Sequence, residues 1–217
     1  MVKTEPARDA RDRDTEQRIL DAAHAVFVRR GTAGARMQEI ADEAGVNKAL
    51  LHYYFRSKDR LAEAVFAQVA RGIFVPLAAT LASDLPLEEK VMRLVELEHE
   101  QLTRSPFLPG YFLSEMNHYP DRLPQLVAAA TAMPPDAVAE RVLAPLRRQI
   151  AERVAAGTMR DITAEQFLVS LVSLCIFPFA ARPMVCLILG LDADGFAAFM
   201  ESRRRELGAF FLQAVRP

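Results

Sequence analysis

The 217-residue chain contains 51% hydrophobic and 25% charged residues and has a formal net charge of −1 at pH 7. The apolar content excludes a disordered chain, and the balanced charge argues against a protein coated in nucleic acid. Residues 1–60 carry a net charge of +2 and the remainder −3. This small asymmetry points weakly to a negatively charged partner for the N-terminal part.

Signals for the cellular compartment favour the cytoplasm. The N-terminus lacks the apolar h-region of a signal peptide. Cys175 and Cys186 lie in apolar runs, which favours buried free thiols over a disulfide framework. The apolar stretch 167–191 is interrupted by two prolines and Arg182. We therefore expect buried soluble helices there rather than a membrane span.

The N-terminal part is predicted to contain an arm and four helices. Residues 1–14 are polar without an apolar period, which is typical of a flexible arm. Helical spacing then predicts helices over 15–30, 36–44 and 47–55, the last with Asn47 as its N-cap. A fourth, longer helix begins at a Ser57 cap and is expected to fade near Pro76.

The remaining sequence also has helical spacing throughout, and no alternating pattern predicts a strand. Helices are expected over 87–104, 107–119, from Asp121 onward, 136–156, 163–177 with a Thr163–Gln166 capping box, and 193–214, and a short helix or turn over 182–190. The fold class predicted from these elements is all-α.

Residues 36–55 have the spacing of a helix-turn-helix, because Gly45 permits the sharp turn and Ala41 lets the two helices cross closely. On a helical wheel the second helix has a seating half of Leu50, Leu51, Tyr54 and Phe55, and an opposite half of Lys48, Ala49, His52 and Tyr53. The second half carries groups suited to phosphates and base edges. An ordinary helical hairpin, with a solvated lysine and core aromatics, fits the spacing as well.

The segment 18–65, "RILDAAHAVFVRRGTAGARMQEIADEAGVNKALLHYYFRSKDRLAEAV", resembles the DNA-binding domain of TetR-type transcriptional repressors. The elements "ILDAA…F…G", "IA..AGV" and "L.YYF.SK..L" stand in register, and the resemblance decides between the two interpretations. It implies a three-helix DNA-binding domain over 15–58 and a larger helical domain over 59–217 that binds a small molecule and dimerises. The expected partners are double-stranded operator DNA, an inducer and a second copy of the chain.

Position by position, the resemblance makes Gln38 a base contact, Tyr54 a contact to the DNA backbone and Lys58 a phosphate contact. The recognition helix would supply Asn47, Lys48, Ala49, His52 and Tyr53. Two departures affect this assignment. "GAR" stands where serine or threonine commonly opens the second helix, so Arg36 becomes a candidate phosphate contact. "ALLH" replaces the frequent "GTLY", which leaves the bases that are read undetermined.

The large domain offers a few isolated polar groups in apolar surroundings. Glu98 falls on the buried stripe of the helix over 87–104 and His99 at its edge, and a buried carboxylate needs a partner. They could face a ligand together with Tyr111, His118 and Arg182, or Glu98 could form a structural ion pair with an arginine. A metal site of Glu96, His99, Glu100 and His118 is a weaker alternative without a metal signature, so no metal or cofactor is predicted.

The aromatic and methionine content of 107–119 and 174–188 predicts an apolar inducer with room for one acidic or polar head group. The helices over 163–177 and 193–214 have apolar stripes broader than one chain needs, which predicts a four-helix dimer interface. Its residues would be Phe167, Leu171, Leu174, Phe196, Phe199, Met200, Leu207 and Phe210.

An enzyme is not expected, because the sequence has no Gly-rich phosphate loop, HExxH pattern or nucleophile elbow. A helical carrier without DNA binding would make the recognition helix incidental. The function predicted from the sequence is a ligand-responsive repressor, released from a palindromic operator when the inducer binds.

Overall fold

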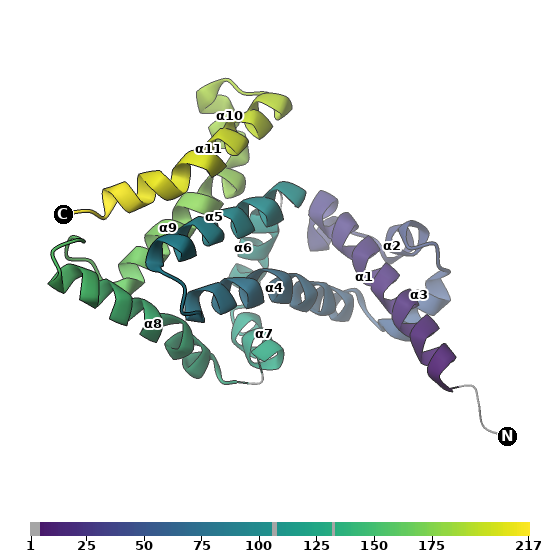
Figure 1. Ribbon diagram of the computed structural model, residues 1–217. Coiled ribbons are helices and arrows are strands. Elements are labelled where there is room, and N and C mark those ends of the chain that lie inside the picture. Colours follow the sequence, from purple (N-terminus) through teal and green to yellow (C-terminus); the bar gives the residue numbers. More distant parts are fainter. Residues whose placement is uncertain (1–4, 106–107, 132) are drawn as a thin grey trace. The chain divides into compact units, whose positions relative to one another are not determined.

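The computed structural model describes residues 5–105, 108–131 and 133–217, and its regular elements there are all helices, which confirms the all-α class (Figure 1). In chain order the helices are α1 Glu5–Gly34, α2 Met37–Glu43, α3 Lys48–Tyr54, α4 Lys58–Ala82, α5 Leu87–Arg104, α6 Leu108–His118, α7 Arg122–Thr131, α8 Pro135–Ala155, α9 Ala164–Ala180, α10 Arg182–Leu189 and α11 Ala193–Ala214. The chain divides into two compact units, residues 1–69 and 70–217.

The N-terminal unit is built around a small core supplied by α1, α2, α3 and the first turns of α4. Its fully buried side chains include Ile19, Phe27, Ile40, Leu51 and Phe66. Gly45 has φ +64°, a left-handed conformation that residues with a Cβ rarely adopt. The backbone N–H of Val46 then donates to the carbonyl of Ala41. This closed turn joins α2 to α3 and confirms the predicted helix-turn-helix.

The first helix begins earlier than the sequence predicted. α1 starts at Glu5, whereas residues 1–14 were expected to be a flexible arm. The polar residues in this stretch lack an apolar face, but Asp14 and Arg18 form an i,i+4 ion pair at 3.7 Å. Such pairs stabilise a solvated helix without a core contact. Gly31 has φ +67° and ψ 164° and interrupts the helical geometry where the sequence predicted a stop, and a short helical segment continues beyond this kink to Gly34.

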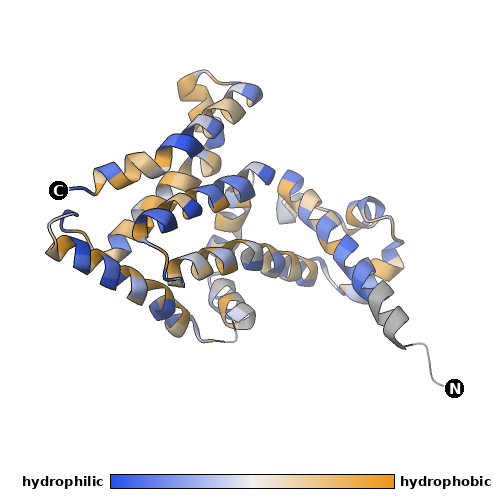
Figure 2. Cartoon of the chain, viewed as in Figure 1, coloured by the Kyte–Doolittle hydropathy of each residue, from blue (hydrophilic) through white to orange (hydrophobic). Residues whose placement is uncertain are grey.

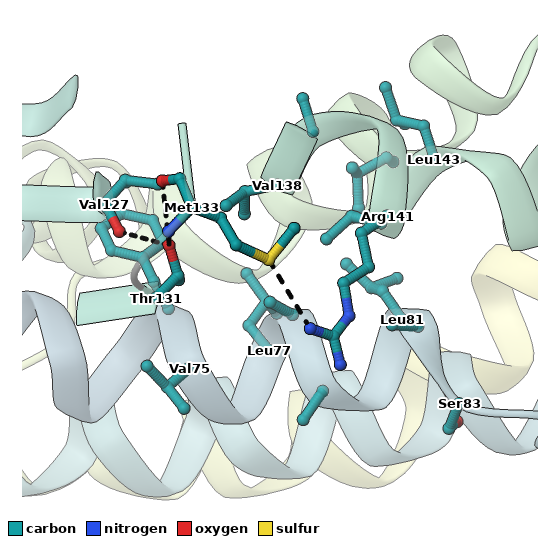
Figure 3. Close-up of a pocket in the computed structure, with 17 residues that line it drawn as sticks. Val75, Leu77, Leu81, Ser83, Val127, Thr131, Met133, Val138, Arg141 and Leu143 are labelled. Carbon is teal, nitrogen blue, oxygen red and sulfur yellow. Dashed lines mark hydrogen bonds between the residues drawn. The ribbon is translucent and has the colours of Figure 1, made fainter. Parts of the chain in front are cut away.

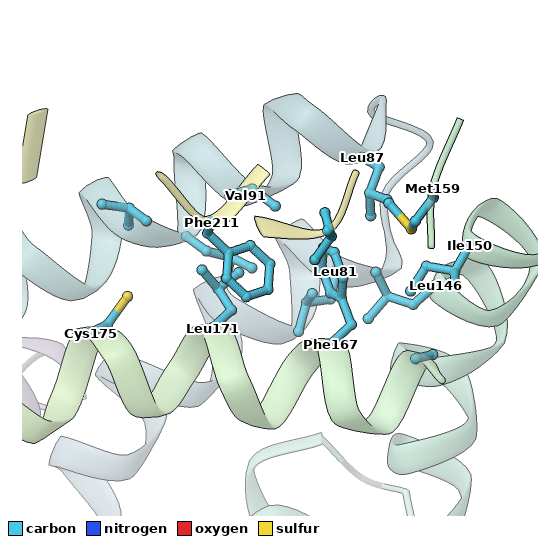
Figure 4. Close-up of a cluster of buried hydrophobic side chains, with 14 of the residues drawn as sticks. Leu81, Leu87, Val91, Leu146, Ile150, Met159, Phe167, Leu171, Cys175 and Phe211 are labelled. Atoms are coloured by element: carbon cyan, nitrogen blue, oxygen red, sulfur yellow. The ribbon is translucent and has the colours of Figure 1, made fainter. Parts of the chain in front are cut away.

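The C-terminal unit has its main core between α5, α8, α9 and α11 (Figure 4). The Phe167 and Phe211 rings from α9 and α11 pack edge to face with centroids 4.9 Å apart. α11 approaches α5 closely at Gly208, where an added Cβ would lie 2.3 Å from the sulfur of Met92. Glycine at this position therefore allows the two helices to pack together.

α4 continues through Pro76 to Ala82, although the sequence predicted that it would fade near this proline. Pro76 removes only one backbone donor. Of the apolar residues around it, Phe74 and Leu77 are half-buried and Val75 is 44% exposed. By length and composition α4 would suffice to cross a membrane, and so would α9 and α10 if the pair, bent by 77°, were one span. Helices at the core of soluble proteins have the same composition.

α10 differs from the buried helix expected for this stretch. None of its residues is buried, and Leu187 is 82% exposed. Figure 2 colours much of this helix as hydrophobic. α9, in contrast, buries one side of its length in the core, including Cys175. Cys186 in α10 is half-buried, so only one of the two free thiols is buried as predicted.

Candidate DNA-binding surface and ligand pockets

The short helix α3 is fixed at both ends by local interactions. Asn47 precedes it in an extended conformation, and its side-chain oxygen accepts a hydrogen bond from the N–H of Leu50 at 2.7 Å. This confirms Asn47 as the N-cap. At the other end the N–H of Phe55 donates to the carbonyl of Leu51. This capping hydrogen bond fixes the orientation of the Asn47 side-chain amide relative to α3.

α3 presents one half of its surface to solvent. Leu51 is fully buried and Phe55 nearly so, which seats the helix on the unit. The four side chains on the opposite half are exposed: Lys48, Ala49, His52 and Tyr53. Tyr53 is 77% exposed. Together with Lys48 and His52, this exposed tyrosine gives the surface hydrogen-bond donors, hydrogen-bond acceptors and an aromatic ring.

Leu50 corrects one detail of the predicted division. It was placed in the seating half, but 36% of it is exposed. Tyr54, also in that half, is partly buried, and its hydroxyl donates to Asp12 Oδ1 at 3.1 Å. Burial, and then the hydrogen bond to Asp12, raise the pKa of Tyr54. The contact ties α3 to the start of α1.

Two predicted contacts lie around α2. Gln38 is exposed, and its amide nitrogen donates to Asp42 Oδ1 at 2.8 Å within the same helix. Arg36 is exposed at the N-cap position and makes no side-chain capping bond there. The absent cap agrees with the loss of serine or threonine at this position. It leaves the guanidinium of Arg36 beside the N-terminal end of α2.

Lys58 begins α4 and is partly buried. Its ammonium donates to the carbonyl oxygens of Ala33 at 3.1 Å and Ala35 at 3.4 Å. These carbonyls lie at the C-terminal end of α1, where helical carbonyls lack partners and attract cations. Lys58, which was predicted to contact a phosphate, therefore also links the start of α4 to the end of α1.

The C-terminal unit contains a larger pocket of about 720 Å³ between α4, α7 and α8 (Figure 3). Its walls are mostly apolar and include Phe74, Leu77, Val138 and Leu143. The polar side is marked by Arg141, whose guanidinium lies 3.8 Å from the sulfur of Met133. This pocket has the volume of a site for a small organic molecule.

A second pocket of about 330 Å³ lies between α4, α5, α6 and α9, and we call it the Glu98 pocket. Glu98 is 7% exposed, and its Oε2 atom has no hydrogen-bond partner among the described residues. Burial raises the pKa of Glu98 to about 8. No ion pair joins Glu98 to a described arginine, so the structural alternative considered for this carboxylate is not what the described part of the chain shows.

The other four predicted ligand residues are placed differently. His99 contacts Thr103 at 3.2 Å and Glu201 at 3.6 Å, and burial lowers its pKa. His118 is exposed with Nδ1 2.7 Å from the carbonyl of Ser114. The Arg182 guanidinium lies 4.8 Å from the centre of the Phe196 ring. The Tyr111 side chain lies outside the described residues. None of the three that can be placed lines either pocket.

Sequence reasoning missed the contribution of α4 to both pockets. Phe74 and Leu77 line the larger pocket and the Glu98 pocket alike. The expectation that α4 would fade near Pro76 hid this, although Phe74 and Leu77 are spaced at i and i+3 on one helical face. The described residues contain no group of three or more His, Cys, Asp or Glu side chains that could hold a metal ion.

Most residues predicted for a dimer interface fill the core of the single chain instead. Five of them are buried within one protomer: Phe167, Leu171, Phe196, Met200 and Leu207. Leu174 and Phe199 are half-buried, and Phe210 is 62% exposed. Apolar spacing indicates that a face is covered but not which molecule covers it. The exposed apolar side chains of these two helices are Val169, Phe177 and Phe210.

Comparison with known proteins identifies a family match in the N-terminal part. Residues 19–65 match the model of the family "Bacterial regulatory proteins, tetR family". The chain is 37% identical over 119 residues to the HTH-type transcriptional repressor SCO4008 of Streptomyces coelicolor, over 52% of this chain and 60% of that protein. It is 30% identical over 90 residues to the HTH-type transcriptional regulator TtgW of Pseudomonas putida, over 42% of this chain and 67% of that protein.

The fold extends the likeness over nearly the whole chain. The crystal structure of HlyIIR, a hemolysin II transcriptional regulator, aligns with a TM-score of 0.60 over 95% of this chain and 99% of that one, at 20% identity. This identity supports the shared fold alone. The match to SCO4008 spans less than two thirds of that repressor's length.

Proposed function

Because the chain belongs to the TetR family of helix-turn-helix transcriptional regulators, a family of soluble regulators and not of enzymes, we propose that it is a cytoplasmic repressor that binds operator DNA as a homodimer and is released by a small molecule. The observation that carries the proposal is the exposed half of α3, whose four side chains have no part in the core. The name of the similar SCO4008 protein, a transcriptional repressor, supports the direction of regulation.

The exposed half of α3 would enter the major groove. Lys48 can reach a phosphate or a guanine edge, and Ala49 suits a thymine methyl group. His52 and Tyr53 offer hydrogen bonds to base edges or phosphates. Around them, Arg36 and Gln38 at α2 and Lys58 at α4 would contact the DNA backbone or an adjacent base. Six of these seven residues are exposed and Lys58 is partly buried, which supports this assignment.

The small molecule would bind in the C-terminal unit. Both pockets there have mostly apolar walls, and α4 contributes to both. A molecule that binds one conformation of the protein more tightly shifts the population toward it. If the favoured conformation is one that cannot place two α3 helices on the operator, DNA is released.

For the homodimer, the exposed apolar side chains offer a revised surface. Val169 and Phe177 lie eight residues apart on one side of α9, and Phe210 lies on α11. Such residues are candidates for an interface between copies of the chain. A dimer with two-fold symmetry predicts a palindromic operator with half-sites one helical turn apart, or a multiple of that.

The test is a selection of bound sequences from fragmented bacterial genomic DNA with the purified full chain. The expected result is enrichment of a palindromic sequence. His52→Ala and Tyr53→Ala should change the enriched sequences or lower affinity, whereas Tyr119→Ala, which removes an exposed tyrosine of the other unit, should leave both unchanged. Binding without sequence preference, or identical behaviour of all three variants, would contradict the proposal.

A further inference from the structure

The Glu98 pocket combines an apolar wall with one buried carboxyl group. We infer that it binds a lipophilic amine, with an apolar body among the pocket's side chains and its ammonium group paired with Glu98. This inference rests on the proposed function and deepens it by naming the chemical class of the inducer. It also replaces the acidic head group that the sequence had allowed.

The position of Glu98 is the first argument. The side chain is 93% buried, and Oε2 has no hydrogen-bond partner among the described residues. A buried polar atom without a partner is costly, and such atoms are rare in folded proteins. The Glu98 residue is one of those that line a cavity. A ligand there that supplies a donor would satisfy Oε2 once the carboxyl group turns toward it.

The charges around Glu98 are the second argument. Among the described residues that line this pocket no side chain is basic, and the only other strongly polar one is that of Gln101. On α9, Cys175 is close enough for its pKa to be raised in part by Glu98, after burial. The charge of Arg203 on α11 lowers the pKa of Cys175 in part. Arg203 Nη2 donates to the carbonyl of Leu174 at 3.0 Å, and its buried Nε has no partner among the described residues. The neighbouring His99 faces Glu201 on α11.

These surroundings discriminate between head groups. A carboxylate ligand would lie beside an acidic residue without any cation in the pocket lining to pair with it. A protonated amine would neutralise the charge of Glu98 and donate to its free oxygen, and such charge-assisted bonds are the strongest hydrogen bonds in proteins. Since the pKa of Glu98 is about 8, its proton is readily given up near neutral pH when a cation arrives.

The aromatic rings of the pocket favour the same class of ligand. Phe74 of α4 and Phe112 of α6 both line it, with ring centroids 5.4 Å apart. Ring faces attract cations, particularly where water is excluded. The volume of about 330 Å³ lies at the small end of ligand sites, so the body of the amine should be compact or a single chain.

The experiment compares three probes that share a ten-carbon chain: decylamine, decanol and decanoate. Binding to the full-length protein is measured by calorimetry at pH 7, without DNA. The expected order is decylamine at least tenfold tighter than decanol, with decanoate weakest. Glu98→Gln should bring decylamine and decanol within about threefold of each other. Glu100→Gln, which removes an exposed carboxylate of the same helix, should keep the wild-type order.

A second measurement uses the wild-type protein alone. Decylamine binding repeated in two buffers of different ionisation enthalpy should reveal release of close to one proton per ligand as Glu98 ionises, whereas decanol should release none. Equal affinity for amine and alcohol, tightest binding of decanoate, preference retained in Glu98→Gln, or no proton release would each overturn the inference. None of these results depends on operator binding, whose absence in the genomic selection would overturn the proposed function alone.

Discussion

Replacing Lys58 by alanine tests two roles of one ammonium group, one that the structure shows and one that we propose. Lys58 donates to the carbonyls of Ala33 and Ala35 at the end of α1, and it is also the proposed phosphate contact. Loss of the first role should lower the stability of the free protein. Loss of the second should weaken DNA binding for every sequence, because a phosphate carries no base information.

The structure sets the size of each effect. Hydrogen bonds to a charged group contribute about 1.5–3 kcal/mol. One of these two is long at 3.4 Å. Lys58 is also partly exposed, so that water replaces part of the interaction. We expect Lys58→Ala to reduce the free energy of unfolding by about 1–2 kcal/mol. Loss of one phosphate contact should lower the slope of log affinity against log salt by about one unit.

The assay is urea unfolding followed by circular dichroism, together with operator binding at several salt concentrations. Lys48→Ala is the matched control, since Lys48 is exposed on α3 and should lose a phosphate or base contact while stability changes by less than about 0.5 kcal/mol. If Lys58→Ala destabilises the protein but leaves the salt slope unchanged, its phosphate role is refuted. If stability is unchanged, the reasoning from the α1 carbonyls is refuted.

Three further changes test the packing and the buried charges. Leu51→Ala should cost about 2–5 kcal/mol in urea unfolding because the side chain is fully buried, whereas the more exposed Leu50→Ala should cost clearly less; equal costs would disprove the seating of α3. The pKa of Glu98 is raised to about 8 by burial, so the folded chain keeps a proton that the unfolded chain releases above about pH 4.3. Wild type should therefore lose stability relative to Glu98→Gln as the pH rises from 5 to 8. If the free energies of unfolding of the two proteins change in parallel with pH, Glu98 is not a buried acid. Burial raises the pKa of Glu88, but the hydrogen bonds from Arg153, a backbone hydrogen bond and the charge of Arg153 together outweigh burial and hold the pKa below its usual value. The stability that this carboxylate contributes is present above its unfolded-state pKa and is lost as the pH falls through its folded-state pKa. The free energy of unfolding of wild type should therefore be higher than that of Glu88→Gln at pH 7 and equal to it in acid. A difference between the two proteins that persists in acid would contradict the ion pair.

The sequence predicted those parts of the fold in which local chemistry and burial agree. The helix over 87–104 was predicted with the bounds that the structure shows, because its apolar stripe and its glutamates at the start coincide. Asn47 and Thr163 were recognised as N-caps because a side-chain oxygen at that position satisfies a backbone N–H of the first turn.

Elsewhere the prediction failed because the effect that determines the structure leaves no trace in the apolar periodicity of the sequence. Residues 5–14 begin α1 in a stretch whose sequence has no apolar periodicity, so the pattern gave no signal for a helix. Pro76 removes one backbone donor, and α4 nevertheless continues to Ala82. For the candidate sites, the exposed half of α3 and the burial of Glu98 followed from helical spacing. The pockets themselves did not, since they depend on which distant helices meet.

Phe74 and Leu77 form part of the wall of both pockets. Two molecules that occupied the pockets together would touch the same two side chains, so the affinity of each would depend on the presence of the other. Thermodynamic reciprocity makes this dependence equal in both directions. A protein with such a shared wall can integrate two chemical signals: a compound with no effect on DNA binding of its own could set the concentration at which another one acts.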